Sequence, residues 1–360
     1  MARPSGLMVP SACHRVDGHD SKDSILTGHE RIVRNPAGPA PVRRPNSVRR
    51  TSTIDTGWPG GFGQPVVMVG RARDVLTGPD GGPPKILAED SFRIGATARR
   101  EILDISVEPH RPSIDVLVGA RGGGHLRALL AEVMPEERVN GSPLYLLLDD
   151  FSGASLVAGW IWSQWVNDWQ ELAQQSGARS TAGRGGVMTD ICAGFEQGST
   201  ALMPDGSSNR SQNSAEVPSL VNPDDPEGWH NLFDHAPVSM RRARRIDVWR
   251  DGGDVRIEVG FQDSGINPKG GRTAIHEYLV HAVARGADLV LAEITVDPRI
   301  LPYRECPNAA PNADKMVGLR LADFRKSVLE TLPGPLGCTH LNDVLRSMAE
   351  VPHLAAHLPH

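Results

Sequence analysis

Residues 49–58 read RRTSTIDTGW and residues 241–250 read RRARRIDVWR, so a similar stretch occurs twice in the chain. Further similar segments follow in the same order in both halves: VVMVGRARDVLT and IEVGFQDSG, EILDISVEPHRP and VLAEITVDPRILP, LVGARGGGHLRALLAEVMP and MVGLRLADFRKSVLETLP. Similar segments in a fixed order indicate an internal repeat. The sequence therefore predicts two tandem, similar modules that pack as a pseudo-twofold pair.

Each module is expected to be rich in strands and to end in a helix. Apolar and β-branched residues alternate in segments such as DVRIEVGFQD, which predicts strands. Apolar residues three and four apart between 321 and 332 predict a helix. The fold class is therefore α+β. The predicted segments are a disordered leader at 1–47, a first β-rich module at 48–165, a loop-rich linker at 166–237, a second β-rich module at 238–350 and a tail at 351–360.

Composition and charge exclude several classes of protein. The chain has 360 residues and a formal net charge of -5, whereas a general nucleic-acid binder needs a basic surface. It opens without the charged and apolar regions of a signal peptide, and no run of about 18 apolar residues predicts a membrane span. We expect a cytoplasmic protein with reduced thiols and with neither nucleic acid nor membrane as a partner.

The second module carries a dense group of side chains that can bind metals or act as nucleophiles. Thiolate and imidazole are the usual ligands of zinc. A zinc ion is therefore one candidate cofactor, although only Cys338 and His340 are close in sequence. The predicted ligands are His276, Cys306, Cys338 and His340. On a strand, the spacing of the last two would place both side chains on one face, but on a helix it would not.

The same four residues also suit nucleophilic catalysis. A thiol needs a nearby imidazole or a helix N-terminus to become a thiolate, and Cys338 directly precedes the predicted helix HLNDVLRSMAEV. Thr339 could equally cap that helix, in which case Cys338 is only a small buried residue. Glu277 and Asp150 are candidate catalytic acids, and Asp149 and Asp150 are expected at the end of a strand.

Arginines surround the turn that precedes the helix in both modules. Paired guanidinium groups suit a carboxylate or a phosphate, although solvated surface arginines are the simpler interpretation. The candidate anion-binding residues are Arg121, Arg127, Arg320 and Arg325.

Several segments resemble a known family. RRIDV, IHEYLVHAVA, ITVDP, YRECPNAAPN, VGLRLADFRK and GCTHLNDVL resemble the uncharacterised bacterial domain-of-unknown-function family 2889, specifically across 241–348. Weaker likeness to long, actinobacterial-type members covers most of the chain after residue 47. The family's usual IHDM reads His276, Glu277, Tyr278 here, which keeps the imidazole and lengthens the acid. The resemblance implies no reaction, only an association with catabolic genes for aromatic or steroid-like compounds.

Two classes of function follow from the sequence. The first is an enzyme or pathway accessory that acts on a hydrophobic, aromatic or steroid-like acid or its thioester, so that a small hydrophobic molecule is the partner. The second is a non-catalytic small-molecule-binding or scaffolding protein in which the cysteines and histidines are structural. A shared site requires Cys306, Cys338 and His340 to meet within a few ångströms.

Overall fold

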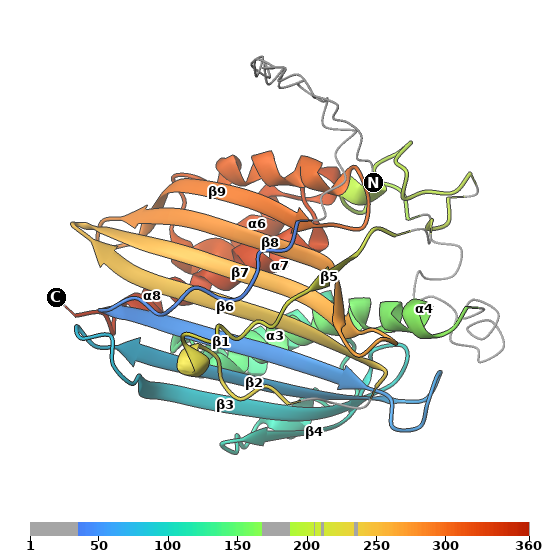
Figure 1. Ribbon diagram of the computed structural model, residues 1–360, viewed down its shortest axis with the longest axis horizontal. Helices are drawn as coiled ribbons and strands as arrows, with labels where there is room; N and C mark the ends of the chain where they lie inside the picture. The colour runs from blue at the N-terminus through green and yellow to red at the C-terminus, as the bar shows by residue number, and fades with distance from the viewer. Residues whose placement is uncertain (1–34, 168–187, 205, 210–211, 234–236, 360) are drawn as a thin grey trace, which may run out of the picture.

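A nine-stranded antiparallel sheet forms the body of the protein in the computed structural model (Figure 1). The structure describes residues 35–167, 188–204, 206–209, 212–233 and 237–359. The strands are β1 (Ser47–Gly57), β2 (Val66–Thr77), β3 (Lys85–Ala96), β4 (Ile102–Glu108), β5 (Ala215–Val217), β6 (Ser239–Asp251), β7 (Asp254–Ile266), β8 (Arg272–Arg285) and β9 (Val290–Ile300). The predicted α+β class is confirmed.

The long strands form two meanders that meet at the middle of the sheet. The strand order is β4-β3-β2-β1-β6-β7-β8, with β9 paired to β8 and the short β5 paired to the first residues of β8. Strands β1 and β6 pair antiparallel along their whole length, from Ser47 opposite Trp249 to Gly57 opposite Ser239. This central pair joins segments that lie far apart in the sequence into one sheet.

The α-helices lie on one face of the sheet, behind it in Figure 1, whereas the short 3-10 helix η5 (Pro226–Gly228) lies in front of it. The α-helices are α1 (Gly124–Val133), α2 (Pro135–Val139), α3 (Pro143–Val157), α4 (Trp162–Trp165), α6 (Phe324–Thr331), α7 (Thr339–Ser347) and α8 (Val351–Ala355). The 3-10 helices are η2 (Ile114–Leu117), η3 (Ala158–Ile161), η4 (Ala193–Phe195), η5 (Pro226–Gly228), η6 (Cys306–Met316), η7 (Leu321–Asp323), η8 (Gly334–Leu336) and η9 (Met348–Glu350). The helix expected between 321 and 332 is present as η7 and α6.

Two segments without long elements, 35–46 and 212–233, cross the opposite face; we call them the straps and this face the strap face. The straps contact each other and the sheet: Ala40 N–H donates to Leu220 O at 2.9 Å, and Arg43 pairs with Asp225 at 2.8 Å. Residues 35–46 were expected to belong to a disordered leader, and this part of the expectation is wrong. Residues 1–34 and 168–187, in the expected leader and linker, lie outside the described residues.

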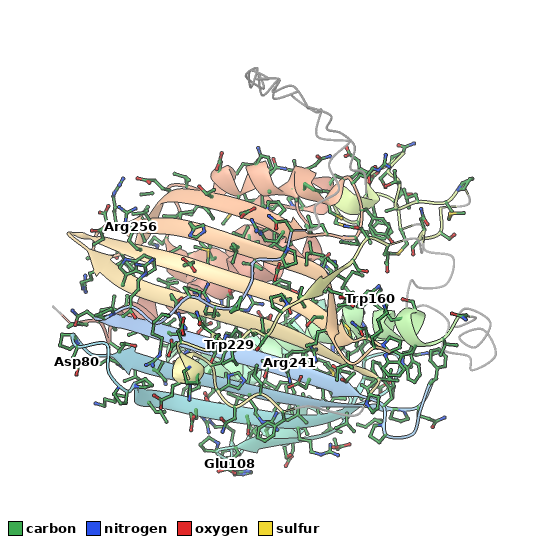
Figure 2. All side chains as sticks on the ribbon, in the orientation of Figure 1. Asp80, Glu108, Trp160, Trp229, Arg241 and Arg256 are labelled. Atoms are coloured by element: carbon green, nitrogen blue, oxygen red, sulfur yellow. The ribbon has the colours of Figure 1, made fainter. Side chains whose placement is uncertain are left out.

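Charged residues are buried on both faces of the central strands. Because side chains alternate along a strand, neighbouring arginines point to opposite faces. On the helix side, Arg50 pairs with Asp74 at 2.6 Å. On the strap face lies Arg241, labelled in Figure 2. It pairs with Asp55 at 2.6 Å and donates to Phe233 O. The sheet is therefore covered on both sides, and its middle strands are not exposed to water.

The prediction that Asp149 and Asp150 end a strand is wrong, because both lie in the middle of helix α3. Ser142 caps this helix by accepting a hydrogen bond from Tyr145 N–H at 3.2 Å, and Pro143 is its first residue. Helix α3 is buried on nearly all sides, so its apolar run shows no helical period and resembles a buried strand.

The helical stretch Pro143–Trp165 is long and apolar enough, by length and composition alone, to cross a membrane. Most of it is buried inside the protein, between the sheet and other helices. Core helices of soluble proteins have the same length and composition, so we interpret this stretch as a core helix.

Candidate functional site

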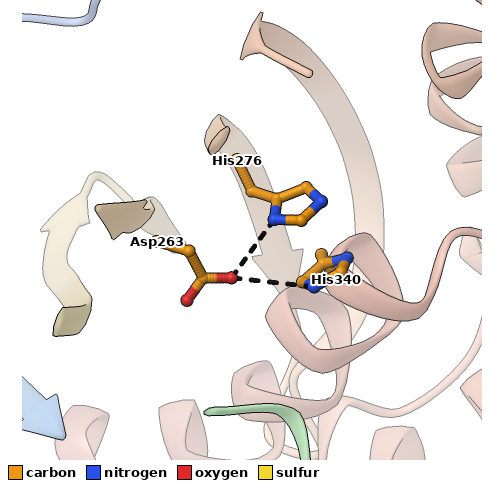
Figure 3. Close-up of side chains that lie close together, drawn as sticks. All are labelled: Asp263, His276 and His340. Atoms are coloured by element: carbon orange, nitrogen blue, oxygen red, sulfur yellow. Dashed lines mark ion pairs between the residues drawn. The ribbon is translucent and has the colours of Figure 1, made fainter. Parts of the chain in front are cut away.

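Asp263, His276 and His340 lie side by side between the sheet and helix α7 (Figure 3). The Asp263 Oδ2 atom is 3.4 Å from His276 Nδ1 and 3.7 Å from His340 Nε2. The two imidazole rings are stacked, with their centroids 3.4 Å apart. We call these three residues the triad. One potential ligand atom from each member lies within 4.8 Å of the others, so the three atoms can contact one small ion together.

The register of strands β7 and β8 and the start of helix α7 bring the three triad residues together. Asp263 on β7 lies directly opposite His276 on β8, and a β-bulge follows between Asp263 and Ser264. Facing residues of antiparallel strands project on the same side, here toward the helices. His340 is in the first turn of α7, after Cys338 at the N-cap position. The two strands therefore supply one pair of side chains, and the helix brings the third to it.

Asp263 and His276 are buried and His340 is nearly so, and only the carboxylate of the triad is charged. Burial alone would raise the pKa of Asp263. The adjacent Arg242 guanidinium lowers this pKa by a larger amount, so the net shift is downward and the carboxyl is ionised. Arg242 donates to both carboxylate oxygens, at 2.9 and 3.0 Å. Burial lowers the pKa of His276, and burial with the neighbouring His276 lowers that of His340 well below its usual value. The triad thus combines one carboxylate with two neutral imidazoles.

Comparison with known families places this geometry in a defined segment of the chain. Residues 240–353 match the model of a family described as "Protein of unknown function (DUF2889)". We call residues 240–353 the DUF2889-like segment. The segment begins in β6 and ends in α8, so all three triad residues belong to it. Neither the curated proteins nor the solved structures contain a significant match to the chain.

The three side chains of the triad, which lie in the DUF2889-like segment, fit a divalent transition metal as ligands. His276 Nδ1 and His340 Nε2 are buried and have no hydrogen-bond partner among the described residues. Zinc–nitrogen and zinc–oxygen bonds of about 2.0–2.2 Å place two ligands of a tetrahedral ion about 3.3–3.6 Å apart. The two distances from Asp263 Oδ2, 3.4 and 3.7 Å, are close to this separation. Two imidazoles and one carboxylate are also the ligand set of many zinc and iron(II) sites.

The predicted cysteine and histidine ligands do not form one site. His276 and His340 meet at Asp263, whereas Cys306 and Cys338 belong to the apolar core. A Cβ atom on Gly194 would lie 2.6 Å from Cys306 Sγ, so Gly194 packs against this thiol. Cys338 and His340 diverge because residues two apart at the start of a helix do not share a face.

The thiols are therefore poor nucleophiles. Burial raises the pKa of Cys306 well above its usual value and also raises that of Cys338, whose Sγ accepts a hydrogen bond from Tyr278 O–H at 3.4 Å. Burial likewise raises the pKa of Cys192 to about 12. A thiolate at either predicted position is disfavoured by its surroundings, and the helix start does not compensate for the burial.

We expect the native thiols to resist alkylation. In a Cys13→Ser background, Cys192, Cys306 and Cys338 should react with iodoacetamide at pH 7.5 at least about 100-fold more slowly than a free thiol, because their raised pKa values keep all three thiols protonated. Mass spectrometry of the native protein checks this, with the urea-unfolded protein as the control that labels three sites. Rapid labelling of Cys306 or Cys338 in the native protein would restore the nucleophile interpretation.

Glu277 and Asp150, the two predicted catalytic acids, lie away from the triad. Glu277 is adjacent to His276 on β8 and therefore points to the strap face, where Gln262 Nε2 donates to it at 2.7 Å. Asp150 on α3 accepts hydrogen bonds from Arg244 Nη2 at 2.7 and 2.8 Å and from Arg244 Nε at 3.2 Å. Neither acid contacts a triad imidazole.

The four predicted anion-binding arginines divide into two kinds. Arg121 and Arg320 are exposed. Arg127 and Arg325 instead reach into a buried ion network between the sheet and the helices, which we call the charge network. Its arginines are Arg50, Arg127, Arg242, Arg244, Arg325 and Arg346, and its acids are Asp74, Asp149, Asp150, Asp263, Asp343 and Glu350. Carboxylates of the protein already occupy these guanidinium groups, so they are not free to bind an anion.

Proposed function

We propose that the protein is a metal-dependent enzyme whose centre is Asp263, His276 and His340. The observation that carries the proposal is the pair of buried, unpartnered imidazole nitrogens beside one carboxylate oxygen. Catalytic zinc sites use three protein ligands and keep one position open, whereas structural sites use four. A bound ion would act as a Lewis acid and lower the pKa of a water molecule.

The chain's own residues orient the three donors. Arg242 holds both oxygens of Asp263, which fixes the direction of the carboxylate. The side chain of His340 is 13% exposed, against 7% for His276 and 0% for Asp263, so a substrate would approach the triad from the α7 side. The substrate class proposed is the one expected from the sequence, a hydrophobic acid or its thioester. Water would then replace the predicted cysteine as the nucleophile, in keeping with the burial of the thiols.

The proposal predicts stoichiometric metal. Protein purified without chelators should contain about one zinc or iron ion per chain, and occupancy should fall in His276→Ala and His340→Gln. Loss of a partner that merely orients a ligand lowers metal affinity about 10- to 100-fold, so loss of a ligand should lower it at least as much. Plasma emission spectroscopy measures the content. His281→Ala is the matched control, because His281 lies on the same strand but is about half exposed.

An activity assay distinguishes an enzyme from a non-catalytic binding protein. The metal-loaded protein should hydrolyse at least one member of a panel of aromatic and steroid acyl thioesters, and His340→Gln and chelator should both abolish this activity. If the protein bound metal but showed no activity, the competing class, a non-catalytic binding protein, would be favoured. The observation that supports this class is the cavity on the strap face, described below. Absence of metal from the wild-type protein, together with failure to take up added zinc or iron(II), would contradict both forms of the proposal.

The two meanders are, in our proposal, copies of one module related by a pseudo-twofold axis between β1 and β6. Reciprocal ion pairs support this relation. Arg49 of the first RR-x3-ID segment pairs with Asp247 of the second at 2.5 Å, and Arg241 of the second pairs with Asp55 of the first at 2.6 Å. Each segment thus gives its first arginine to the aspartate of the other, as a twofold axis requires.

The strands outside the central pair support the same relation. Asp74 on β2 and Asp263 on β7 each pair with a buried arginine on the neighbouring central strand, and a β-bulge follows each of them. Opposite Asp74 lies Ala88, however, whereas opposite Asp263 lies His276. The second module alone therefore has the donors of the triad, and the first would act as its structural support.

A further inference from the structure

A cavity of about 390 Å³ lies on the strap face, between the straps and strands β6, β7 and β8. Its floor consists of cross-strand rows: Ala243, Gln262 and Glu277 form one, and Arg245, Gly260 and Leu279 form the next. His281, about half exposed, also lines the cavity. The volume falls within the usual range for ligand pockets. This strap cavity is on the opposite face of the sheet from the triad.

Small residues of the floor leave the space open. Gly260 has no side chain and Ala243 has only a methyl group, so no side chain fills the space above the middle of the floor. A Cβ atom on Gly260 would come no closer than 3.5 Å to any neighbour, so close packing does not require glycine here. The walls above are apolar, with Pro39 and Leu220 from the two straps. The middle of the cavity therefore suits an apolar group.

The charges around the cavity do not cancel. Arg245 is bonded to both Asp247 and Glu258, and Arg49 also pairs with Asp247, so this group of two cations and two anions is neutral. Glu277 is different, because it is 3% exposed and the guanidinium near it, that of Arg299, is paired with Asp297 instead. A buried carboxylate that faces a cavity and has no ion-pair partner of its own is costly, and a cation in the cavity would offset that cost.

The bonds of Glu277 are consistent with an ionised acceptor. Its Oε1 accepts from Gln262 Nε2 at 2.7 Å, and its Oε2 accepts from Ala37 N–H of the strap at 2.8 Å. Both partners are neutral donors, which orient the carboxylate without neutralising it.

Trp229 contributes an aromatic wall with a free donor. It lines the cavity from the second strap and is 5% exposed, and its indole Nε1 has no hydrogen-bond partner among the described residues. An indole ring beside a carboxylate is a common environment for an ammonium group, because the ring face attracts cations. The unpaired indole N–H adds a site for a hydrogen-bond acceptor on the same ligand.

We propose that the strap cavity binds a small, mostly apolar amine, with its ammonium group against Glu277 and its apolar body over Gly260 beside Trp229. Simple acids are excluded from this site because Glu277 would repel them. The site is independent of the triad: His276 and Glu277 are neighbours in sequence, but they face opposite sides of the sheet. Binding of the amine should therefore persist in His340→Gln, even if that variant has lost its metal.

Isothermal titration calorimetry of the full-length protein with 2-phenylethylamine tests the proposal, with 3-phenylpropionate and 2-phenylethanol as matched probes. The amine should bind about tenfold or more tightly than either analogue, because a hydrogen bond to a charged group contributes about 1.5–3 kcal/mol. Glu277→Gln preserves the shape of the side chain and should remove that preference. Gly260→Val should fill the floor and abolish binding of the amine.

Gly57→Val is the control for the second variant, since Gly57 ends β1 and a Cβ there would contact nothing within 4 Å. It should bind the amine as the wild type does. Circular dichroism confirms that each variant is folded. The proposal is overturned if 3-phenylpropionate binds as tightly as the amine, if both Glu277→Gln and Gly260→Val leave amine affinity unchanged, or if the wild-type protein binds none of the probes at millimolar concentration.

Discussion

Replacement of Arg242 by methionine is expected to destabilise the protein by about 3–5 kcal/mol, the range found when one partner of a buried ion pair is removed. Arg242 donates to both oxygens of Asp263 and, at 2.9 Å, to Asp343 Oδ2. Its Nη1 is also 4.0 Å from Asp150 Oδ1. Methionine fills a similar volume but leaves these three buried carboxylates without the guanidinium that they share.

Urea unfolding in the presence of EDTA measures this loss without a contribution from bound metal. Arg256→Met is the control, because Arg256 is a partly exposed arginine whose pair with Asp251 lies at the surface, and surface pairs contribute about 0–1 kcal/mol. Adding Asp263→Asn to Arg242→Met should recover part of the lost stability, since one uncompensated charge is then removed. A loss below about 1 kcal/mol in Arg242→Met would show that the carboxylates are solvated and that the charge network is not a buried unit.

The size of the expected effect follows from the continuity of the charge network. Alternating acids and arginines connect β7 to β2 through α3, α7 and η9, and every charge between the two ends of this path has two or more partners of opposite charge. The path runs Asp263, Arg242, Asp343, Arg127, Asp149, Arg325, Glu350, Arg50 and Asp74. A network of this kind is costly to desolvate, and it specifies one arrangement of helices on the sheet only because every member is paired.

The local parts of the fold were predictable because their signals are local. Alternation along DVRIEVGFQD and the apolar spacing of 321–332 correspond to β7 and to η7 with α6. Helix α3 was assigned wrongly because it is buried on nearly all sides, so its sequence lacks the polar face that distinguishes a helix from a buried strand. The repeated arginine pairs pointed to the two strands that meet at the centre of the sheet.

The triad was predictable only in part. His276 and His340 were singled out as ligand-type residues, but Asp263 was not, because its role depends on which residue of β8 lies opposite it. That register follows from the bulge, which the sequence does not mark. One signal was present: Asp263 belongs to a segment similar to the one that contains Asp74, and both acids pair with the second arginine of an RR pair. Cys338 was grouped with His340 because the two are close in sequence, but residues two apart at the start of a helix do not share a face.

Acid is expected to destabilise the protein through His230 by about 2 kcal/mol between pH 7 and pH 5. This histidine is 6% exposed on the strap face, where its Nδ1 and Nε2 bond to Thr51 Oγ1 and Thr53 Oγ1 at 2.9 and 2.8 Å. Burial, with the nearby charge of Arg73, lowers the pKa of His230 from 6.5 to about 3. Other charges close to it are Asp55, Arg241 and Arg71.

The sign follows from the two pKa values. Because the folded-state pKa is lower than the unfolded-state value of 6.5, the unfolded chain binds a proton first as the pH falls. The stabilising contribution of neutral His230 is complete above pH 6.5 and is lost progressively as the pH falls toward 3. By pH 5 an unfolded histidine is almost fully protonated, which favours unfolding by about 2 kcal/mol, and this figure holds for any folded-state pKa well below 5.

Comparison of the wild type with His230→Gln isolates this contribution, since carboxylates and other histidines titrate in both proteins. Glutamine can donate to one threonine hydroxyl and accept from the other, so the variant should fold, although less stably at pH 7. Urea unfolding at several pH values gives the difference in free energy between the two proteins. That difference should shrink by about 2 kcal/mol from pH 7 to pH 5. Parallel stability curves would instead mean that the folded protein accepts a proton on His230 as readily as the unfolded chain does, so that its two threonine partners do not keep it neutral.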